Sequence, residues 1–420
     1  MNTSKNRWLI ATSAVGIHLS IGSVYAWSVF TNPLHQAYQW SLTEISFTFS
    51  IAILFLGLSA AFMGHFVEKF GPRASGLFAA CFFGIGMTGS GFAVHMSSLP
   101  LLYLFYGVLA GIGLGVGYIA PVSTLVKWFP DRRGLATGLA IMGFGFASLI
   151  CSPIIQFLIE KVDIANTFYI LGIIYFIIMV VSSLYLSTPT PDDVKHFDLN
   201  TKQRKVPQDL SQLTANEAIK TRRFYYLWLM LFINITCGIA IISVASPLSQ
   251  ESVGFTAGAA ATLVGILGAF NGLGRIGWAS FSDYIGRPNT YTIFFSIQLI
   301  AFPLLPYIKD PLIFSIVMAV IYTCYGGGFA SIPAYIGDLF GTKQLGAIHG
   351  YILTAWAAAG LAGPLFSSFI RDITGNYTQS LLVFSGLFFI ALIISLLIRK
   401  DIEQLKQSKV TADLSVTART

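Results

Sequence analysis

The chain has 420 residues, of which 55% are hydrophobic and only 10% carry a charge. Soluble globular proteins carry a charge on about a quarter of their residues, so these few charges cannot cover a water-facing surface. The 4 Cys and the 40 Gly, which follow no three-residue period, also exclude a disulfide scaffold and a collagen-like fibre. The composition therefore indicates an all-α integral membrane protein with many spans.

Twelve apolar runs are long enough to cross a bilayer, whose hydrocarbon core of about 30 Å requires roughly 20 residues of helix. The first run follows only Lys5 and Arg7 and has no small-residue cleavage site after it, so we expect it to be retained as a helix. The predicted spans are 8–30, 42–66, 74–96, 99–126, 134–158, 165–187, 224–250, 258–282, 290–308, 311–339, 347–370 and 378–399.

A polar segment that contains several prolines separates the sixth span from the seventh. It mixes Lys, Arg, Asp and Gln without an apolar period, so we interpret it as a solvated connector with a short surface helix near 210–220. A regulatory domain is the alternative. The predicted domains are an N-terminal six-helix half over 1–187, a cytoplasmic linker over 188–223, a C-terminal six-helix half over 224–400 and a cytoplasmic tail over 401–420.

The positive charges are distributed unequally between the two sides of the predicted membrane. With the N-terminus inside, the outside loops hold only Lys161, Lys309 and Arg371, and nearly all other Lys and Arg lie in the inside loops and tails. The positive-inside bias therefore predicts that both termini are cytoplasmic. The same scatter over short loops argues against a nucleic-acid partner, despite the net charge of +7.

Two loop segments of the first half recur in the second half. Gly64–Arg73 and Ala279–Arg287 both place a small residue, a carboxylate four positions later, and then Gly and Arg. Phe129–Gly138 is echoed by Phe340–Gly350 at a similar offset. Two echoes at one offset indicate two homologous halves, and parallel halves of this kind place a substrate site near the midplane between them.

The first of these repeated loops carries the charged pairs Glu68 with Arg73 and Asp283 with Arg287. A carboxylate at a helix end can accept hydrogen bonds from the amides of a facing helix and pair with a nearby arginine. We therefore predict that these residues form a conformational latch between the halves. Charges that only set the topology of short loops are the alternative.

The chain resembles the major facilitator superfamily in its twelve spans, its long central loop and its repeated small-x-x-x-acid-x-x-Gly loop. Within that superfamily, Gly22–Ser28, Lys127–Gly134 and Asn271–Arg275 resemble the oxalate/formate antiporter family and its bacterial monocarboxylate carriers. The resemblance implies a secondary transporter in the cytoplasmic (inner) membrane that works by alternating access.

Arg275 is the one Lys, Arg, Asp or Glu that falls well inside a predicted span. Because burying an arginine at that depth costs several kcal/mol and no acid lies inside a span to pair with it, the position predicts an anion site. The guanidinium suits a carboxylate, and Asn271, one turn earlier, can add a hydrogen bond. The resemblance assigns the same role to this arginine. A structural arginine that snorkels to the interface is the alternative.

In the resembled family the oxalate exchanger has a lysine in the eleventh span, where this chain has Trp356 when aligned on Gly350 and Tyr351. One cation neutralises one carboxylate, so the replacement favours a monocarboxylate such as lactate, pyruvate or formate over oxalate. We expect Trp356 to form a wall of the cavity. A tryptophan that only packs or faces lipid is the alternative.

Tyrosines supply the other predicted contacts to substrate. Tyr118 and Tyr325 lie in Gly-rich parts of the fourth and tenth spans, and the resemblance to lactate and pyruvate carriers implies a binding tyrosine at each place. Tyr25 belongs to the first resembled segment and is also a candidate, and Tyr322 is a weaker one. A tyrosine that packs at the membrane interface is the alternative for each.

His18 lies near the middle of the first span, two helical turns before Tyr25. Its imidazole titrates near neutral pH, so it is a candidate proton relay. A neutral histidine that hydrogen-bonds a neighbouring helix is the alternative. Without a buried acid, the proton of a symporter is carried either by this histidine or by the carboxylate of the substrate.

We therefore predict a secondary active transporter of a small monocarboxylate, working by proton symport. An oxalate/formate-type anion exchanger and a carboxylate sensor on a transporter fold are the alternatives. No nucleophile with a base, paired acids or metal-ligand spacing occurs at one depth, so we expect neither an enzyme nor a metal site nor a cofactor. The expected partners are a small carboxylate anion, a proton and the lipid bilayer, and we expect a monomer.

Overall fold

The computed structural model describes residues 5–129, 133–190, 210–341 and 344–417. Within these ranges, the side chains of 64, 65, 68, 126, 133–140, 345, 346 and 408–417 lie outside the description. The described residues form helices joined by short turns, with no strand among them.

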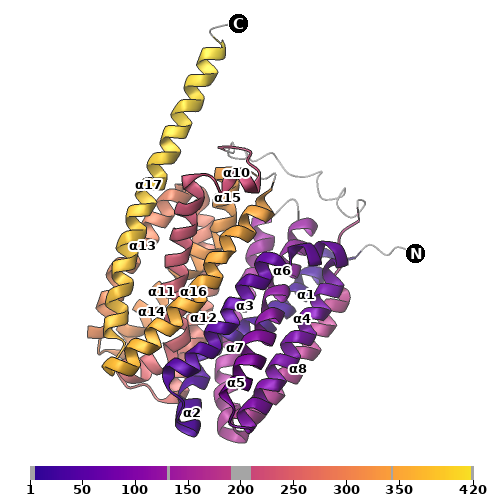
Figure 1. Cartoon of the computed structure of the whole chain (residues 1–420), viewed down its shortest axis with the longest axis vertical. Helices are drawn as coiled ribbons and strands as arrows, with labels where there is room; N and C mark the ends of the chain where they lie inside the picture. Colours follow the sequence, from indigo (N-terminus) through magenta and orange to yellow (C-terminus); the bar gives the residue numbers. More distant parts are fainter. Residues whose placement is uncertain (1–4, 130–132, 191–209, 342–343, 418–420) are drawn as a thin grey trace.

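The helices that precede the linker, here called the early helices, are α1 to α8 with two short irregular helices. They are α1 (Arg7–Ile21), η1 (Gly22–Ala26), α2 (Ser28–Tyr38), α3 (Leu42–Phe62), α4 (Gly64–His95), α5 (Leu99–Leu102), η2 (Tyr103–Ala110), α6 (Gly111–Trp128), α7 (Arg133–Val162) and α8 (Ile164–Tyr185). Figure 1 shows α4, α6 and α8 together on the right of the bundle.

The helices that follow the linker, here called the late helices, are α11 to α17. They are α11 (Arg222–Val253), α12 (Ala257–Ile285), α13 (Arg287–Leu304), η5 (Leu305–Tyr307), α14 (Pro311–Ala330), α15 (Ile332–Phe340), α16 (Leu345–Thr374) and α17 (Thr378–Thr417). In Figure 1, α11, α13, α14 and α17 lie on the left of the bundle.

Twelve of these helical segments are long and apolar enough to cross a bilayer, which confirms the predicted number of spans. Their ends lie within a few residues of the predicted ends for most spans, for example Ile164–Tyr185 for the sixth. The first differs because its α-helix tightens to a 3-10 helix at Gly22–Ala26 and then continues as α2. The fourth contains a π-helical stretch, Tyr103–Ala110. Such irregular turns redirect the side chains that follow them.

Close crossings join the early helices to the late helices at α3 with α16 and at α7 with α12. A Cβ atom added to Gly145 of α7 would lie 2.5 Å from the backbone of Gly268 and 2.5 Å from that of Gly272 in α12. A Cβ atom added to Gly57 of α3 would lie 2.7 Å from the backbone nitrogen of Ala357 in α16. Glycine therefore permits backbone-to-backbone contact at both crossings.

The end of the linker is attached to the late helices. The amide of Leu210 donates to Asp338 O at 2.9 Å, and the amide of Leu213 donates to Phe340 O at 2.8 Å, so both satisfy carbonyls at the end of α15. The short helix α10 (Ala215–Ala218) follows, with a capping box between Thr214 and Glu217. The predicted surface helix is confirmed in shortened form, but this part of the linker is a docked segment rather than a solvated connector. The predicted domain boundaries stay a prediction.

Candidate functional site

Arg275 lies on α12, and its side chain is held by three neutral oxygens. Arg275 is only 2% exposed. Nε donates to Asn271 Oδ1 at 3.3 Å, Nη1 donates to the carbonyl of Ile141 at 3.4 Å, and Nη2 donates to the Tyr25 hydroxyl at 3.4 Å. The guanidinium therefore bridges α12 to α7 and η1, at the contact between late and early helices.

No carboxylate in the described part of the chain forms an ion pair with Arg275. Ion pairs that the described structure does contain involve Arg223, Arg287 and Arg371 near helix ends, and Arg399 within α17. A buried cation bound only by neutral dipoles keeps its attraction for an anion, since neutral acceptors offset part of the desolvation penalty and none of the charge.

The face of an aromatic ring also covers the guanidinium. The Arg275 Cζ atom lies 5.1 Å from the centroid of Phe329, within the range of a cation–π contact. The Phe329 ring packs edge-on against Trp356 at 4.8 Å between centroids. Phe329 is a residue that the sequence interpretation missed, and the Gly-rich segment just before it is the signal that could have drawn attention to it.

Tyr25 and Tyr325 meet beside the cation although 300 residues separate them. Their hydroxyl oxygens lie 3.1 Å apart, and the Tyr25 hydroxyl also accepts from Arg275. The ring of Tyr325 lies against Gly238 of α11, where an added Cβ atom would be 2.1 Å from the ring. Glycine at 238 therefore leaves room for this ring beside the site.

Tyr118 and Trp356 pack together on the other side of Phe329. Their ring centroids are 5.5 Å apart, and both residues are buried. Within the described structure, the Tyr118 hydroxyl and Trp356 Nε1 have no hydrogen-bond partner, and neither does Asn271 Nδ2. Buried polar atoms are normally satisfied. These three groups can each donate a hydrogen bond, and their residues cluster around the Arg275 guanidinium, which no described carboxylate neutralises. Such a set of donors suits an anion that carries several acceptor oxygens.

His18 lies next to Tyr118 among the early helices. Its Nε2 is 3.3 Å from the backbone carbonyl of Tyr118, and because a carbonyl only accepts, Nε2 must carry the proton of this hydrogen bond. Its ring also packs against Phe144 at 5.6 Å, and Phe144 packs against Tyr25 at the same centroid distance. Phe144 is a second aromatic residue that the sequence interpretation missed.

The structure brings together only part of the predicted latch. Arg287 donates to Ser282 and pairs with Asp283, and its Nε lies 3.5 Å from Asp338 of α15. All of these residues belong to the late helices. Arg73 is exposed, and the side chain of Glu68 lies outside the described residues. Asp338 is the partner that the sequence interpretation missed. The latch role stays a prediction.

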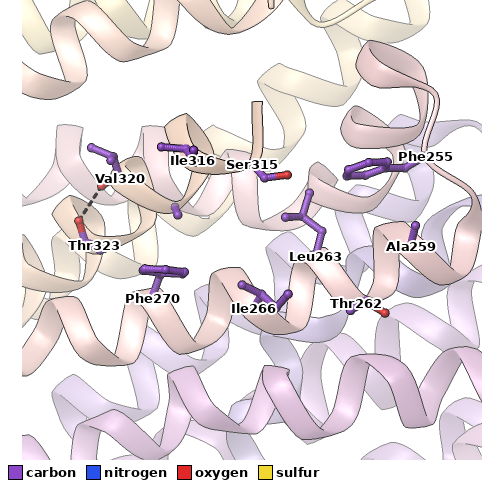
Figure 2. Close-up of a pocket in the computed structure, with 11 residues that line it drawn as sticks. Phe255, Ala259, Thr262, Leu263, Ile266, Phe270, Ser315, Ile316, Val320 and Thr323 are labelled. Carbon is purple, nitrogen blue, oxygen red and sulfur yellow. Dashed lines mark hydrogen bonds between the residues drawn. The ribbon is translucent and has the colours of Figure 1, made fainter. Parts of the chain in front are cut away.

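The site residues are buried, and an apolar groove lies apart from them. Figure 2 shows an apolar groove of about 500 Å³ between α12 and α14, lined by residues such as Phe255, Ile266 and Ile316. None of the predicted site residues lines it. Tyr322, the weaker candidate, is buried, and its hydroxyl has no partner in the described structure.

Twelve candidate spans around a buried cationic site, where early and late helices meet, define a membrane carrier. The chain belongs to the major facilitator superfamily, whose family model matches residues 12–364. It is therefore a multi-pass transporter rather than an enzyme, and the predicted fold class is confirmed.

Several curated relatives of the chain are named for the carboxylates they transport. It is 30% identical to the oxalate:formate antiporter of Oxalobacter formigenes over 361 residues, which cover 85% of this chain and 83% of the antiporter. It is 26% identical to monocarboxylate transporter 12 of Homo sapiens, over 89% of this chain and 75% of that one. It is 22% identical to apicoplast pyruvate carrier 1 of Toxoplasma gondii, over 67% and 62% respectively.

A solved structure has the same fold. The crystal structure of a bacterial homologue of the human lysosomal transporter Spinster, in an inward-facing and unoccupied conformation, superposes with a TM-score of 0.73. The match covers 96% of this chain and 99% of that one, at 14% sequence identity. This likeness shows the fold alone.

Proposed function

We propose that this transporter carries a small monocarboxylate, such as lactate, pyruvate or formate, together with a proton. The observation that carries the proposal is the single buried guanidinium of Arg275, whose described partners are all neutral. One monocarboxylate neutralises it, whereas a dicarboxylate brings a second charge that the site residues Trp356 and Phe329 do not offset.

The carboxylate has a direct way to bind. The bonds from Arg275 Nη1 and Nη2 to Ile141 O and the Tyr25 hydroxyl are both long, at 3.4 Å, and a charged acceptor forms shorter and stronger bonds to the same two nitrogens. The Tyr118 hydroxyl, which can rotate, and the Trp356 Nε1–H group then supply two neutral donors to the carboxylate. Both groups lack a hydrogen-bond partner in the described structure.

Transport follows from the position of the site between early and late helices. The substrate binds to Arg275 from α12 and to Tyr118 from α6, so it contacts both the late and the early helices. Rocking of the early helices against the late helices then changes the side of the membrane from which the substrate site is accessible. The proton enters either on His18 or on the bound carboxylate. Protonation of the carboxylate weakens its bond to Arg275 and favours release.

The test is uptake into proteoliposomes. We expect labelled lactate, pyruvate or formate to accumulate when an inward proton gradient is imposed, and labelled oxalate to accumulate poorly. Arg275→Ala is expected to lower uptake by about thirtyfold or more, the loss typical of removing one partner of a buried charged contact. Arg399→Ala, which removes an exposed arginine paired with Glu403 at 3.4 Å in α17, is the matched control. Full uptake by Arg275→Ala would overturn the proposal.

Anion exchange is the second candidate, favoured by the 30% identity to an oxalate:formate antiporter. It predicts that uptake requires a carboxylate inside the vesicle and does not respond to a proton gradient. Vesicles loaded with formate and vesicles loaded with buffer alone, each with and without the gradient, separate the two mechanisms. Better competition by oxalate than by any monocarboxylate would show that Trp356 does not exclude a second charge.

A further inference from the structure

Two fully buried amide side chains lie behind the site, in helices that contribute none of its predicted residues. Asn234 belongs to α11 and Gln298 to α13, and neither is exposed. An amide in the interior of a membrane protein destabilises it unless the amide is hydrogen-bonded, so a connected pair at this depth requires an explanation.

The backbone of α14 determines how this pair is oriented. Asn234 Nδ2 donates to the carbonyl of Tyr325 at 3.3 Å, and Gln298 Nε2 donates to Asn234 Oδ1 at 3.1 Å. Because a carbonyl can only accept, the NH₂ group of Asn234 must face Tyr325, and its oxygen must then face Gln298. The direction of both hydrogen bonds is therefore set by one backbone oxygen.

The same stretch of α14 is fitted closely to its neighbours. A Cβ atom added to Gly328 would lie 2.6 Å from Asn234 Nδ2, and one added to Gly326 would lie 2.3 Å from Asn271 O on the α12 side. The Tyr291 hydroxyl of α13 donates to the carbonyl of Gly328. Side chains of α11 and α13 thus donate hydrogen bonds to two carbonyls of the segment 325–328, and α12 packs against Gly326 of the same segment.

The held segment carries the residues that contact the cation. The Tyr325 hydroxyl meets the Tyr25 hydroxyl, which accepts from Arg275, and Phe329 lies one turn further along α14 with its ring over the guanidinium. A continuous chain of hydrogen-bonded residues therefore runs from Gln298 through Asn234, Tyr325 and Tyr25 to Arg275.

We propose that Asn234 and Gln298 are positioning residues of the anion site, which hold α14 in the register that places Tyr325 and Phe329 beside Arg275. The inference rests on the proposed function. Neither amide touches the substrate; each acts through the backbone of Tyr325. If the two amides served only to stabilise the helix packing, their loss would lower the stability of the folded protein. The effect of that loss on uptake would then not depend on the Tyr325 hydroxyl.

A double-mutant cycle on uptake separates the two roles. Asn234→Leu removes the donor at nearly constant volume, and Tyr325→Phe removes only the hydroxyl. We expect each single variant to lower uptake at low monocarboxylate concentration by about tenfold, and the double variant to be little worse than either one. Ser243→Ala, at another fully buried polar residue of α11, is the control and should leave uptake unchanged.

Multiplicative losses in the double variant would overturn the inference, since they would show that Asn234 does not act through Tyr325. Gln298→Met gives a second test if Asn234→Leu fails to fold, because it keeps the bond from Asn234 to Tyr325 while removing the donor to Asn234 Oδ1, which loosens the hold on the Asn234 side chain. It should raise the concentration for half-maximal uptake by about threefold, and an unchanged value would contradict the inference. If Arg275→Ala retains full uptake, the proposed function fails instead.

Discussion

Among the described residues, the two ends of the helix bundle show different contacts. At the predicted outer end, hydrogen bonds cross from early to late helices. Asn32 donates to Gln250 at 3.1 Å, and Thr43 donates through its amide and hydroxyl to Asp372 at 2.9 and 2.5 Å. Ser46 and Ser368 also share a hydrogen bond. At the predicted cytoplasmic end, Arg287 binds residues of the late helices.

This difference indicates that opening the predicted outer end requires hydrogen bonds between early and late helices to break. Opening the outer end separates the N-terminus of α3 from the Asp372 carboxylate, which there satisfies an orphan amide and interacts favourably with the helix dipole. The ion pairs of Arg287 with Asp283 and Asp338 instead join late helices to one another. These contacts between early and late helices therefore stabilise closure of the predicted outer end, and three substitutions test that contrast.

The largest effect is expected from Gly268→Val at the crossing of α12 with α7. An added Cβ atom there would lie 2.5 Å from Ser148 Cβ and 2.6 Å from Gly145 O, so the early and late helices must separate. Overpacking of this kind destabilises proteins by about 1–3 kcal/mol. We expect a thermal midpoint lower by several degrees and loss of most uptake. Gly277→Val, in the same helix with no heavy atom within 4 Å, is the control. Equal midpoints for the two variants would contradict the expected clash.

An intermediate effect is expected from Asp372→Ala, which removes the acceptor of the Thr43 amide and hydroxyl at the N-terminus of α3. Loss of a side-chain acceptor for an N-terminal helix amide costs about 1 kcal/mol, which is about a fivefold shift toward the state in which the predicted outer end is open. The measurement is the labelling rate of Thr31→Cys, at a buried site next to Asn32, by an impermeant thiol reagent.

The labelling experiment uses a chain in which Cys81, Cys151, Cys237 and Cys324 are replaced by serine. Glu44→Ala is the matched control, because the Glu44 carboxylate also lies at the N-terminus of α3 but accepts from the amide and hydroxyl of Ser41 at the same helix end. Equal labelling rates for Asp372→Ala and Glu44→Ala would show that the bond across the two groups does not hold the outer end closed.

The smallest effect is expected from Asp283→Asn at the cytoplasmic end. The Asp283 side chain is largely exposed, and an exposed ion pair contributes about 0–1 kcal/mol. We expect a thermal midpoint within about two degrees of the parent and an unchanged labelling rate at Thr31→Cys. A strong loss of uptake or faster labelling would instead favour the predicted latch between the two halves.

The fold could be predicted from the sequence because span length and loop charge are properties of short segments. The burial of Arg275 could be predicted for the same reason, since one charge interrupts an otherwise apolar run. The meeting of Tyr25 with Tyr325 could not be derived from spacing, because it depends on how helices 300 residues apart cross. Phe329 was missed because it is one of 35 Phe, and nothing local distinguishes a ring that covers a cation from one that packs in the core.

The last helix extends beyond the span that the sequence predicts for it. The apolar run ends before Arg399, whereas α17 continues to Thr417. Hydropathy reports where the chain can leave the lipid, and helix propensity decides where the helix stops. Lys, Gln, Glu and Leu, which are common after that point, are strong helix formers.

The length of α17 has a practical consequence. Its 40 residues rise about 60 Å, twice the bilayer core of about 30 Å, and Figure 1 shows the helix projecting well past the rest of the bundle. A fluorescent protein or affinity tag fused to the C-terminus would be carried on this arm, clear of the short loops between the helices. The same arm offers an antibody fragment a rigid epitope, which would add ordered mass outside the detergent micelle for single-particle imaging of this small carrier.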